Sequence, residues 1–389
     1  MQTRNRALLL GAIAVFWLSQ AALAETGGRL VGHVVDENFQ PLQEALITVT
    51  GTGAVGVYTS RTDEKGWYSI VGLPMHEALI VKGEAPGKID KVYAGIWVQR
   101  GQDTERDFRL RPPGHHEILV LLDPDNPTHV LALEGARSTL PGSIVEAVVK
   151  GTTLKDERLV RYEISHLPNA VVSIGRDASL LARREARQSP MIFMLVPDPK
   201  GDKLLRSNSC GIALNSGLQE QLARLAEVAP GAKNLVTVFN PRRLARVVRD
   251  LRAAAKERGM TLTARSARSV EEAARVLERM RSDPADVFFL LHDPEFFDEP
   301  RLSLIRKFVE ERDLIYVVPD TYFFDMGGNL TDAPGFRAMG EEAGIIVRHV
   351  LGGSPALLEL GVVVPEKRIF AVTPELRDRL GIAPVATGD

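Results

Sequence analysis

The sequence predicts a multidomain protein, in which an N-terminal all-β sandwich is followed by two α/β doubly wound lobes. Three observations lead to this fold class. The chain has 389 residues, enough for two or three domains. From Gly28 to about Pro112, short alternating strands are separated by turn residues, which is typical of a β-sandwich. From Glu117 onward, strands alternate with helices, which predicts parallel sheets covered by helices.

The start of the chain has the three parts of a secretory signal peptide. Arg4 and Arg6 form a positively charged region, residues 8–18 form an apolar core, and Ala22-Leu23-Ala24 is a small-x-small cleavage site. The apolar run is shorter than the roughly 20 residues that span a bilayer. We therefore expect residues 1–24 to be removed, leaving an exported, periplasmic bacterial protein with no transmembrane segment.

The composition excludes several functions. A formal net charge of -2 leaves no basic face for a nucleic-acid partner. Cys210 is the only cysteine, so it cannot form an internal disulfide, and we expect a small buried side chain there. His115 and His116 lack a third metal ligand at suitable spacing, and no Ser or Cys lies in a nucleophile elbow. We therefore predict no metal, no cofactor, no catalytic residues and no enzyme.

The first domain should contain about seven short strands. Gly66 ends a turn at residues 62–66 and suits a positive φ angle. We expect Trp67 and Trp97 in the core or on a sheet face rather than as platforms for sugar rings. The expected strands are 30–35, 45–49, 55–60, 67–71, 79–82, 96–99 and 107–110.

The segments GHVVDENFQPLQEALITV and TDEKGWYSIVGLP resemble the carboxypeptidase regulatory-like domain, a transthyretin-like sandwich. The resemblance implies a non-catalytic spacer or docking domain over residues 25–112, with a linker at 113–116. The residues that fall on the family's pattern are Gly32, Asp36, Pro41, Leu42, Ala45, Asp63, Gly66, Tyr68 and Leu73.

The centre of the chain reads as one βαβ unit. Residues 170–174 and 191–196 are apolar runs rich in β-branched or large residues, which suits strands that are buried on both faces. Between them, Gly175 breaks the first strand, Asp177 can cap the next helix, and residues 178–188 have helical spacing. In open parallel sheets, ligands bind at the carboxyl ends of the strands. Those ends are therefore where we place the candidate site.

The same alternation continues on both sides of this unit. We expect a first lobe near 117–215, a second near 232–325 and a C-terminal crossover over 326–389. Ser269 and Glu272 form the spacing of a capping box. The other expected strands are 117–122, 144–149, 210–214, 234–239, 262–264, 287–291 and 314–318, and the other expected helices are 128–140, 156–166, 218–229, 242–258, one beginning at 269, and 301–311.

Charged and aromatic residues follow several of these strands. Arg176 could bind a carboxylate with help from helix N-terminal amides, although a solvated arginine is the alternative. Asp177 is either a helix cap or a ligand contact. An aspartate at a strand end could hold an ammonium group, but Asp beside Pro also occurs in plain turns. The candidate ligand-binding residues are Asp123, Gly175, Arg176, Asp177, Asp198, Asp293, Asp320, Thr321 and Tyr322.

Further residues near the strand ends have two interpretations each. Phe323 and Phe324 could stack on a ligand ring with Tyr322, or pack in the core. Phe296 and Phe297 are candidates for the rim of a cleft. His292 beside an aspartate indicates acid–base chemistry only weakly.

Four segments together resemble substrate-binding proteins of ABC transporters of the tryptophan/tyrosine type. The resemblance implies the type I periplasmic-binding-protein fold, a small solute that is an aromatic amino acid in some members, and an ABC permease as partner. In that group, the position of Arg176 or Asp177 is commonly a small hydroxyl residue that contacts the ligand. The segments are PNAVVSIGRDASLLARREARQSPMIFMLVPDP, LQEQLARLAEVAPGAKNLVTVFNP, the late helix with Gly340, Glu341 and Ala343, and PEKRIFAVTPELRDRLGI.

Two lobes joined by crossovers form a cleft that can close around a small ligand. The first hypothesis is therefore an exported solute-binding protein that captures a small solute, such as an amino acid or a related carboxylate, for an ABC transporter. The alternative is an envelope interaction or sensor protein with a degenerate binding module. An α/β hydrolase is the third and least supported interpretation.

Overall fold

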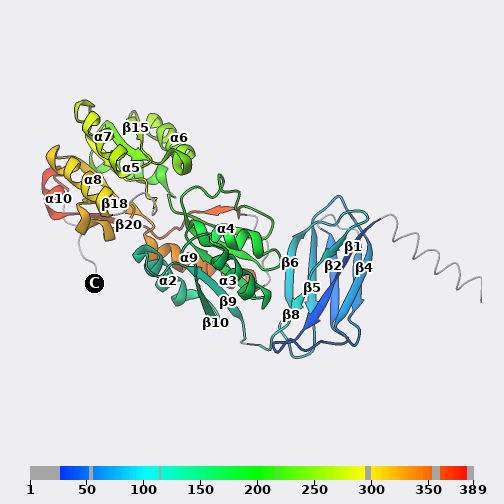
Figure 1. The fold of residues 1–389 in the computed structure, drawn as a ribbon. Helices are drawn as coiled ribbons and strands as arrows, with labels where there is room; N and C mark the ends of the chain where they lie inside the picture. Colours follow the sequence, from blue (N-terminus) through cyan, green and yellow to red (C-terminus); the bar gives the residue numbers. More distant parts are fainter. Residues whose placement is uncertain are drawn as a thin grey trace, which may run out of the picture.

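The computed structural model describes residues 27–51, 56–113, 115–215, 217–293, 299–352 and 360–382. Figure 1 shows a β-sandwich, a first α/β lobe and a second α/β lobe that follow one another in a row. The predicted fold class, an all-β domain followed by two α/β lobes, is confirmed. The predicted signal peptide lies outside the described residues.

The N-terminal sandwich consists of two four-stranded sheets with one core between them. Alternation along the strands creates this core, because every second residue points inward. In β2, for example, Ile47 and Val49 are buried while their neighbours are partly exposed. The first sheet contains β4 (Trp67–Leu73), β1 (Gly28–Val35), β7 (Asp103–Glu105) and β8 (Phe108–Arg109), and the second contains β3 (Val57–Arg61), β2 (Leu46–Gly51), β5 (Leu79–Glu84) and β6 (Lys91–Ile96).

The last strands of the sandwich differ from the prediction. A strand was expected at 96–99, but β6 occupies Lys91–Ile96 and β7 was missed. The reason is that β6 buries a lysine and contains Gly95 at a φ of 69°, both atypical of a strand. Trp97 follows β6 and is 55% exposed, so it is not a core residue.

The first lobe has a six-stranded, fully parallel sheet with two layers of helices. Helices α2 and α9 cover one face, and α3 and α4 cover the other. The backbones of α2 and α9 approach closely at Gly340, where a Cβ atom would lie 1.9 Å from the carbonyl oxygen of Ala132. In order across the sheet the strands are β10 (Ser143–Val148), β9 (Glu117–Leu122), β11 (Ala170–Ile174), β12 (Met191–Val196), β13 (Ser209–Ala213) and β19 (Val362–Val363), and the helices are α2 (Pro127–Thr139), α3 (Leu154–Ser165), α4 (Arg176–Glu185) and α9 (Phe336–Leu351).

The second lobe repeats this architecture with one antiparallel strand, β20, at the edge of its sheet. Helices α5, α6 and α10 pack on one face, and α7 and α8 pack on the other. The strands in order are β15 (Thr261–Ser266), β14 (Asn234–Phe239), β16 (Val287–Phe289), β17 (Ile315–Val317), β18 (Leu330–Ala333) and β20 (Ile369–Val372), and the helical segments are α5 (Leu218–Val228), α6 (Pro241–Glu257), α7 (Val270–Arg279), η1 (Met280–Ser282), α8 (Glu299–Glu311), η2 (Thr321–Met326) and α10 (Pro374–Leu380).

The chain passes between the lobes three times. It leaves the first lobe after β13, returns between β18 and α9, and leaves again between β19 and β20. The segment 326–389, expected to be a crossover, therefore contributes α9 and β19 to the first lobe and β18, β20 and α10 to the second. Lobes that are joined in this way are of the kind that can close by hinge motion around a ligand.

The N-terminal caps of two helices differ from the sequence prediction. Helix α4 begins at Arg176 with Gly175 as its N-cap, so Asp177 lies inside the first turn and is not the cap. At α7, the Ser269 hydroxyl accepts a hydrogen bond from the Glu272 N–H at 3.2 Å, as predicted. The Glu272 carboxylate, however, accepts from the N–H of Arg268 at 2.8 Å rather than from that of Ser269, so the capping box is only half formed.

The sandwich is docked on the first lobe at the amino ends of its strands. Arg111 is 3% exposed and donates to Asn169 Oδ1 at 2.8 Å and to the Leu167 carbonyl at 3.1 Å. Arg109 and Arg111 both contact Glu117 Oε1, at 3.4 and 3.2 Å. In Figure 1, β6 and β8 are accordingly the sandwich strands nearest the first lobe. This contact lies at the opposite end of the sheet from the expected ligand cleft.

None of the helices in the described residues combines the length and the apolar character that crossing a bilayer requires.

Candidate functional site

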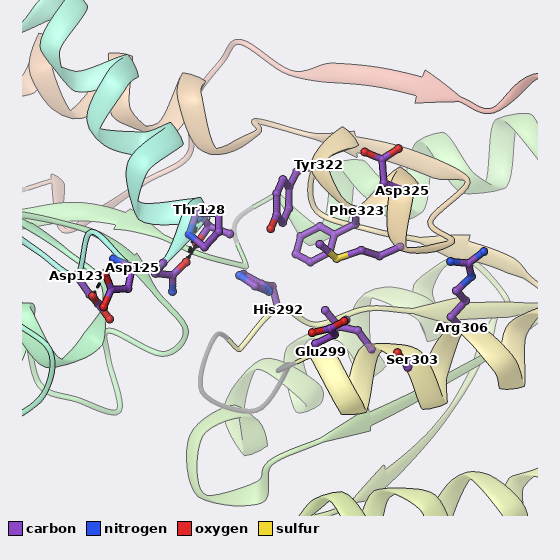
Figure 2. A pocket seen from close by; sticks show the side chains of 14 residues that line it. Asp123, Asp125, Thr128, His292, Glu299, Ser303, Arg306, Tyr322, Phe323 and Asp325 are labelled. Atoms are coloured by element: carbon purple, nitrogen blue, oxygen red, sulfur yellow. Dashed lines mark hydrogen bonds between the residues drawn. The ribbon is translucent and has the colours of Figure 1, made fainter.

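A cavity of about 580 Å³ lies between the two lobes, next to the carboxyl ends of their strands. Figure 2 shows Thr128, Asp123 and Asp125 of the first lobe on one side, and Tyr322, Phe323 and the residues of α8 on the other. Its volume is in the range of ordinary small-molecule sites. The lining residues are Asp123, Asp125, Asn126, Pro127, Thr128, His292, Glu299, Leu302, Ser303, Arg306, Tyr322, Phe323, Asp325 and Met326.

The first-lobe wall is the turn between β9 and α2. Asn126 is the N-cap of α2, and its side chain accepts from the N–H of Thr128 at 3.0 Å and from its hydroxyl at 2.8 Å. Asp123 Oδ1 accepts from the N–H of Asp125 at 3.0 Å. These local bonds hold the turn in one shape, so that Asp123 keeps its place at the cavity. The structure therefore places Asp123 where the sequence predicted it.

The second-lobe wall is the 3₁₀ segment η2. Asp320 is buried and accepts from the N–H of Tyr322 and from the N–H of Phe336, both at 2.8 Å. The two carboxylate oxygens of Asp320 therefore position the segment. The hydroxyl of Thr321 donates to Asp320 Oδ1 at 3.4 Å. Tyr322 itself lines the cavity and meets the Phe323 ring edge-on at 5.3 Å. Of the residues predicted here, Tyr322 lines the cavity and Asp320 has a structural role.

His292 is the most enclosed polar group of the cavity wall. It is 3% exposed, and neither ring nitrogen has a hydrogen-bond partner among the described residues. Its ring packs against Phe323 and Phe336 at 5.1 and 5.5 Å. Burial, and then the nearby His129, lowers its pKa to about 3. The imidazole is therefore neutral at pH 7 and can offer one donor and one acceptor to a ligand.

A smaller pocket of about 180 Å³ shares Asp123 and Asn126 with the main cavity. It lies at the N-terminus of α4, where no side chain caps the free N–H groups. Gly175 has a φ of 89°, and a Cβ atom there would lie 2.4 Å from His129 Cε1. Only glycine fits this turn without strain, so its place in the predicted site is explained by the close approach of the histidine ring.

Basic groups surround this smaller pocket. Its lining includes Arg176 of α4, Arg243 of α6 and Lys150 of the loop after β10. Lys150 is ion-paired with Asp125 at the rim. Asp123 and Asp177 line the same pocket, so the free amides of α4 and these three cations face two carboxylates there.

Two of the predicted residues are engaged by partners in the protein. Arg176 donates from Nε and Nη2 to both carboxylate oxygens of Asp202, at 2.7 to 3.1 Å. Asp293 is fully buried and pairs with Arg243 at 3.0 Å, while burial raises its pKa. Arg176 is thus neither freely solvated nor an unpaired guanidinium, and Asp293 lies behind the pocket wall.

Asp198 connects the lobes. One oxygen accepts from the Gly201 N–H at 2.9 Å, and the other lies 3.6 Å from Nε of Arg246 in the second lobe. A second link runs from Nδ2 of Asn215 to the carbonyl oxygen of His292 at 3.1 Å. Asp198 therefore bridges the lobes at the edge of the cleft instead of lining either cavity.

Several cavity residues were missed from the sequence. Glu299, Ser303 and Arg306 belong to α8, whose start was placed two residues too late at 301. Asn126 could have been found, because Asn followed by Pro is a typical helix N-cap and N1 pair. Phe296 and Phe297 lie outside the described residues.

The main cavity carries an excess of acid. Its lining contains four carboxylates, those of Asp123, Asp125, Glu299 and Asp325, and one guanidinium, that of Arg306. Lys150 pairs with Asp125, and Glu310 pairs with Arg306. In the described part of the chain, no hydrogen bond engages the carboxylates of Glu299 and Asp325. The main cavity thus favours a cationic group, and the smaller pocket beside it favours an anionic one.

Two further predictions concern groups outside the cleft. Cys210 is buried, and burial raises the pKa of its thiol to about 12. The described residues contain no cluster of three His, Cys, Asp or Glu that is placed to hold a metal ion.

Comparison with known proteins supports both parts of the chain. Residues 29–111 match the carboxypeptidase regulatory-like domain, as predicted. The two lobes have the type I periplasmic-binding-protein fold. No curated protein matches the sequence at a significant level.

Three solved structures illustrate the likeness, and each aligns with 70% of this chain. A conserved domain protein from Vibrio cholerae is 16% identical over 96% of its own length, with a TM-score of 0.54. An ABC domain from Streptococcus pneumoniae, in complex with L-Trp, is 18% identical over 97%, with a TM-score of 0.55. A substrate-binding protein with adhesive properties from Clostridium difficile, ligand-free and open, is 14% identical over 97%, with a TM-score of 0.55. At these identities, the likeness establishes the fold.

Proposed function

We propose that this protein is an exported, non-catalytic solute-binding protein of the periplasm that captures a small zwitterionic solute, such as an amino acid, for an ABC permease. The observation that carries the proposal is the pairing of an acidic cavity with a basic pocket between the lobes. The two share Asp123 and Asn126, so one small molecule can occupy both.

The charges of the lining residues support one orientation of the solute. Its carboxylate would lie at the N-terminus of α4, near Lys150 and the guanidinium of Arg176. Its ammonium group would face Asp123, where the acid excess begins. In this pose the free Nη1 of Arg176 can still donate, because its bonds to Asp202 use Nε and Nη2.

The remainder of the solute would extend into the main cavity toward the second lobe. Tyr322 and Phe323 line that side and present aromatic surface. An apolar or aromatic side chain therefore fits there better than a sugar, which would need many hydrogen-bonding groups. The L-Trp complex of the Streptococcus pneumoniae neighbour is consistent with this choice.

The test is thermal unfolding and calorimetric titration of residues 25–389 with amino acids, amines and small carboxylates. A ligand at 100 times its dissociation constant adds about 2.7 kcal/mol to the free energy of unfolding. We expect a hit among the amino acids and not among the amines or carboxylates alone. Tyr322→Ala and Asp123→Asn should each weaken it tenfold or more, about 1.4 kcal/mol.

Matched controls separate a local effect from a general one. Tyr162→Ala removes an exposed tyrosine from α3, and Asp103→Asn removes an exposed aspartate from the sandwich. Both should leave the affinity unchanged. Equal losses in the control and the cleft variants would contradict the proposed site.

The second candidate is an envelope interaction protein with a degenerate cleft. It is favoured by the internal pairing of Arg176 with Asp202 and of Arg243 with Asp293, which neutralises charges that a ligand would otherwise use. Small-angle scattering distinguishes the two. Compaction on adding an amino acid supports solute capture, whereas an unchanged profile across the whole library favours the interaction protein.

A further inference from the structure

A separate cavity of about 440 Å³ lies where the sandwich meets the first lobe. One wall is β6 of the sandwich, including Val92. The other wall consists of residues just before the strands of the first lobe, His116, Asn169 and Pro190, and of the last turn of α9 at Leu351. This cavity is at the opposite end of the first-lobe sheet from the cleft.

Lys91 of β6 lines this cavity, and no carboxylate of the described residues forms an ion pair with it. The residue is 6% exposed, and its Nζ has no hydrogen-bond partner among the described residues. The Tyr93 ring lies 5.2 Å from its Nζ, and Glu117 attracts the amine from beyond ion-pair distance. Lys82, on the same cavity, is different, because it pairs with Glu84 and Asp90 at 2.7 Å each. An unpartnered buried ammonium is costly unless a ligand supplies the missing acceptor.

The surroundings of Lys91 are basic. Arg109 and Arg111 share one carboxylate, that of Glu117, at 3.4 and 3.2 Å. Burial, and then these two arginines, lowers the pKa of the Lys91 amine to about 7. His116 adds a second nitrogen, Nδ1, that is buried without a partner in the described part of the chain. Lys91 and His116, each with a nitrogen that lacks a partner in the described residues, therefore line one cavity, and Asp90, the carboxylate among its lining residues, is paired with Lys82.

We propose that this junction cavity binds a small carboxylate with a short apolar tail, whose oxygens accept hydrogen bonds from Lys91 and His116. A monoanion matches the single ammonium on this cavity that forms no ion pair in the described residues. The last carbonyl groups of α9 carry partial negative charge beside the cavity, which disfavours a second negative charge on the ligand. Ile89, Val92 and Val350 provide the apolar surface for the tail.

The bound carboxylate would join two domains. Lys91 belongs to the sandwich, whereas His116 and α9 belong to the first lobe, so the ligand would hold the two together. The proposal does not depend on the cleft or its solute, since no residue lines both sites.

The experiment is calorimetric titration of residues 25–389 at pH 6 with hexanoate, acetate and inorganic phosphate. Three proteins are compared: the wild type, Lys91→Met, and Lys82→Met as a matched control on the same cavity. Lys91→Met removes a buried charge and keeps the aliphatic stem, so it should fold. We expect hexanoate to bind more tightly than acetate or phosphate. Lys91→Met should weaken hexanoate binding at least tenfold, and Lys82→Met by less than about twofold.

Each other outcome overturns the proposal. If the wild type binds no hexanoate, or if Lys91→Met binds it equally well, the site is wrong. Tighter binding of phosphate would refute the carboxylate class. Hexanoate binding that Arg176→Ala abolishes and Lys91→Met leaves intact would place the ligand in the interlobe cleft. Should Lys91→Met not fold, judged by circular dichroism, Lys91→Gln answers the same question.

Discussion

The two ends of the first-lobe sheet differ in charge, in contacts and in openness. At the carboxyl ends of the strands, Asp123 and its neighbours face an open cleft with an acidic main cavity. At the amino ends, Arg109, Arg111 and Lys91 of the sandwich are buried where it meets the first lobe. Parallel strands explain this polarity, because all their carboxyl ends meet on one side. One end is thus available to a moving second lobe, and the other is fixed to a docking domain.

The largest effect should come from Arg111→Ala at the amino end. Arg111 bonds to Glu117, Asn169 and Leu167 from a buried position, so its loss should cost about 3 kcal/mol. Urea unfolding should then show the sandwich and the lobes separating into two transitions. Solute binding in the cleft should persist.

The control for this variant is Arg29→Ala, which removes an exposed arginine paired with Asp103 at 3.4 Å. Its effect should be below about 1 kcal/mol. If both variants lose the same unfolding free energy, the contacts of Arg111 do not hold the sandwich on the first lobe. The two ends of the first-lobe sheet would then not differ in how firmly they are fixed.

Lys91→Met should have the next largest effect, and it should stabilise the protein by about 2 kcal/mol at pH 6, as replacing a buried unpaired charge does. The pKa of Lys91 is about 7 in the folded protein, whereas the ordinary value for a lysine is 10.5. Between these values the unfolded chain binds more protons, so the wild type gains stability as the pH rises. The advantage of the variant should shrink from pH 7 to 10, by at most about 1.4 kcal/mol per pH unit.

The measurement is chemical unfolding of both proteins from pH 6 to 10, with Lys82→Met alongside. A constant difference between wild type and Lys91→Met over this range would show that the pKa of the Lys91 amine is not lowered in the folded protein.

At the carboxyl end, Gly175→Ala should cost about 1–2 kcal/mol, because it combines a φ of 89° with a clash against the ring of His129. It should also weaken solute binding, since the α4 N-terminus would shift. Gly231→Ala is the matched control, because a Cβ there meets no atom within 4 Å. Thermal unfolding measures the stability of both variants. If Gly175→Ala is as stable as Gly231→Ala, the turn at residue 175 accommodates a Cβ atom without strain.

The smallest effect at neutral pH, within about 1 kcal/mol, is expected for His292→Phe, which keeps the packing on Phe323 and Phe336. The pKa of His292 is about 3 in the folded protein, whereas the ordinary value for a histidine is 6.5. The unfolded chain therefore binds more protons in this window, and the wild type loses stability as the pH falls from 6.5 to 3. The variant should lose less, so its acid midpoint should lie at lower pH.

Exposed His349 provides the comparison, and His349→Phe should leave the acid midpoint unchanged. Acid unfolding followed by circular dichroism decides the matter. A shift of the same size in both variants would show that burial of His292 is not the cause.

The sequence alone determined the order of the domains and most of their elements. Strands such as Ala170–Ile174, Met191–Val196 and Asn234–Phe239 were predicted to the residue, because a short apolar run between turn residues has few other solutions. It also located the strand ends where the cleft forms, including Asp123 and Tyr322. The prediction misplaced β6, because the buried Lys91 at its start is atypical of a strand.

Only the tertiary structure decided which charges remain available. Asp202 follows Arg176 by 26 positions, and Arg243 precedes Asp293 by 50, so no local pattern reveals either pair. The docking of Arg111 on Asn169 spans 58 positions. A charge at a strand end is visible in the sequence, but its partner is brought to it by packing of distant elements. Whether that charge serves a ligand or the fold therefore becomes apparent only in three dimensions.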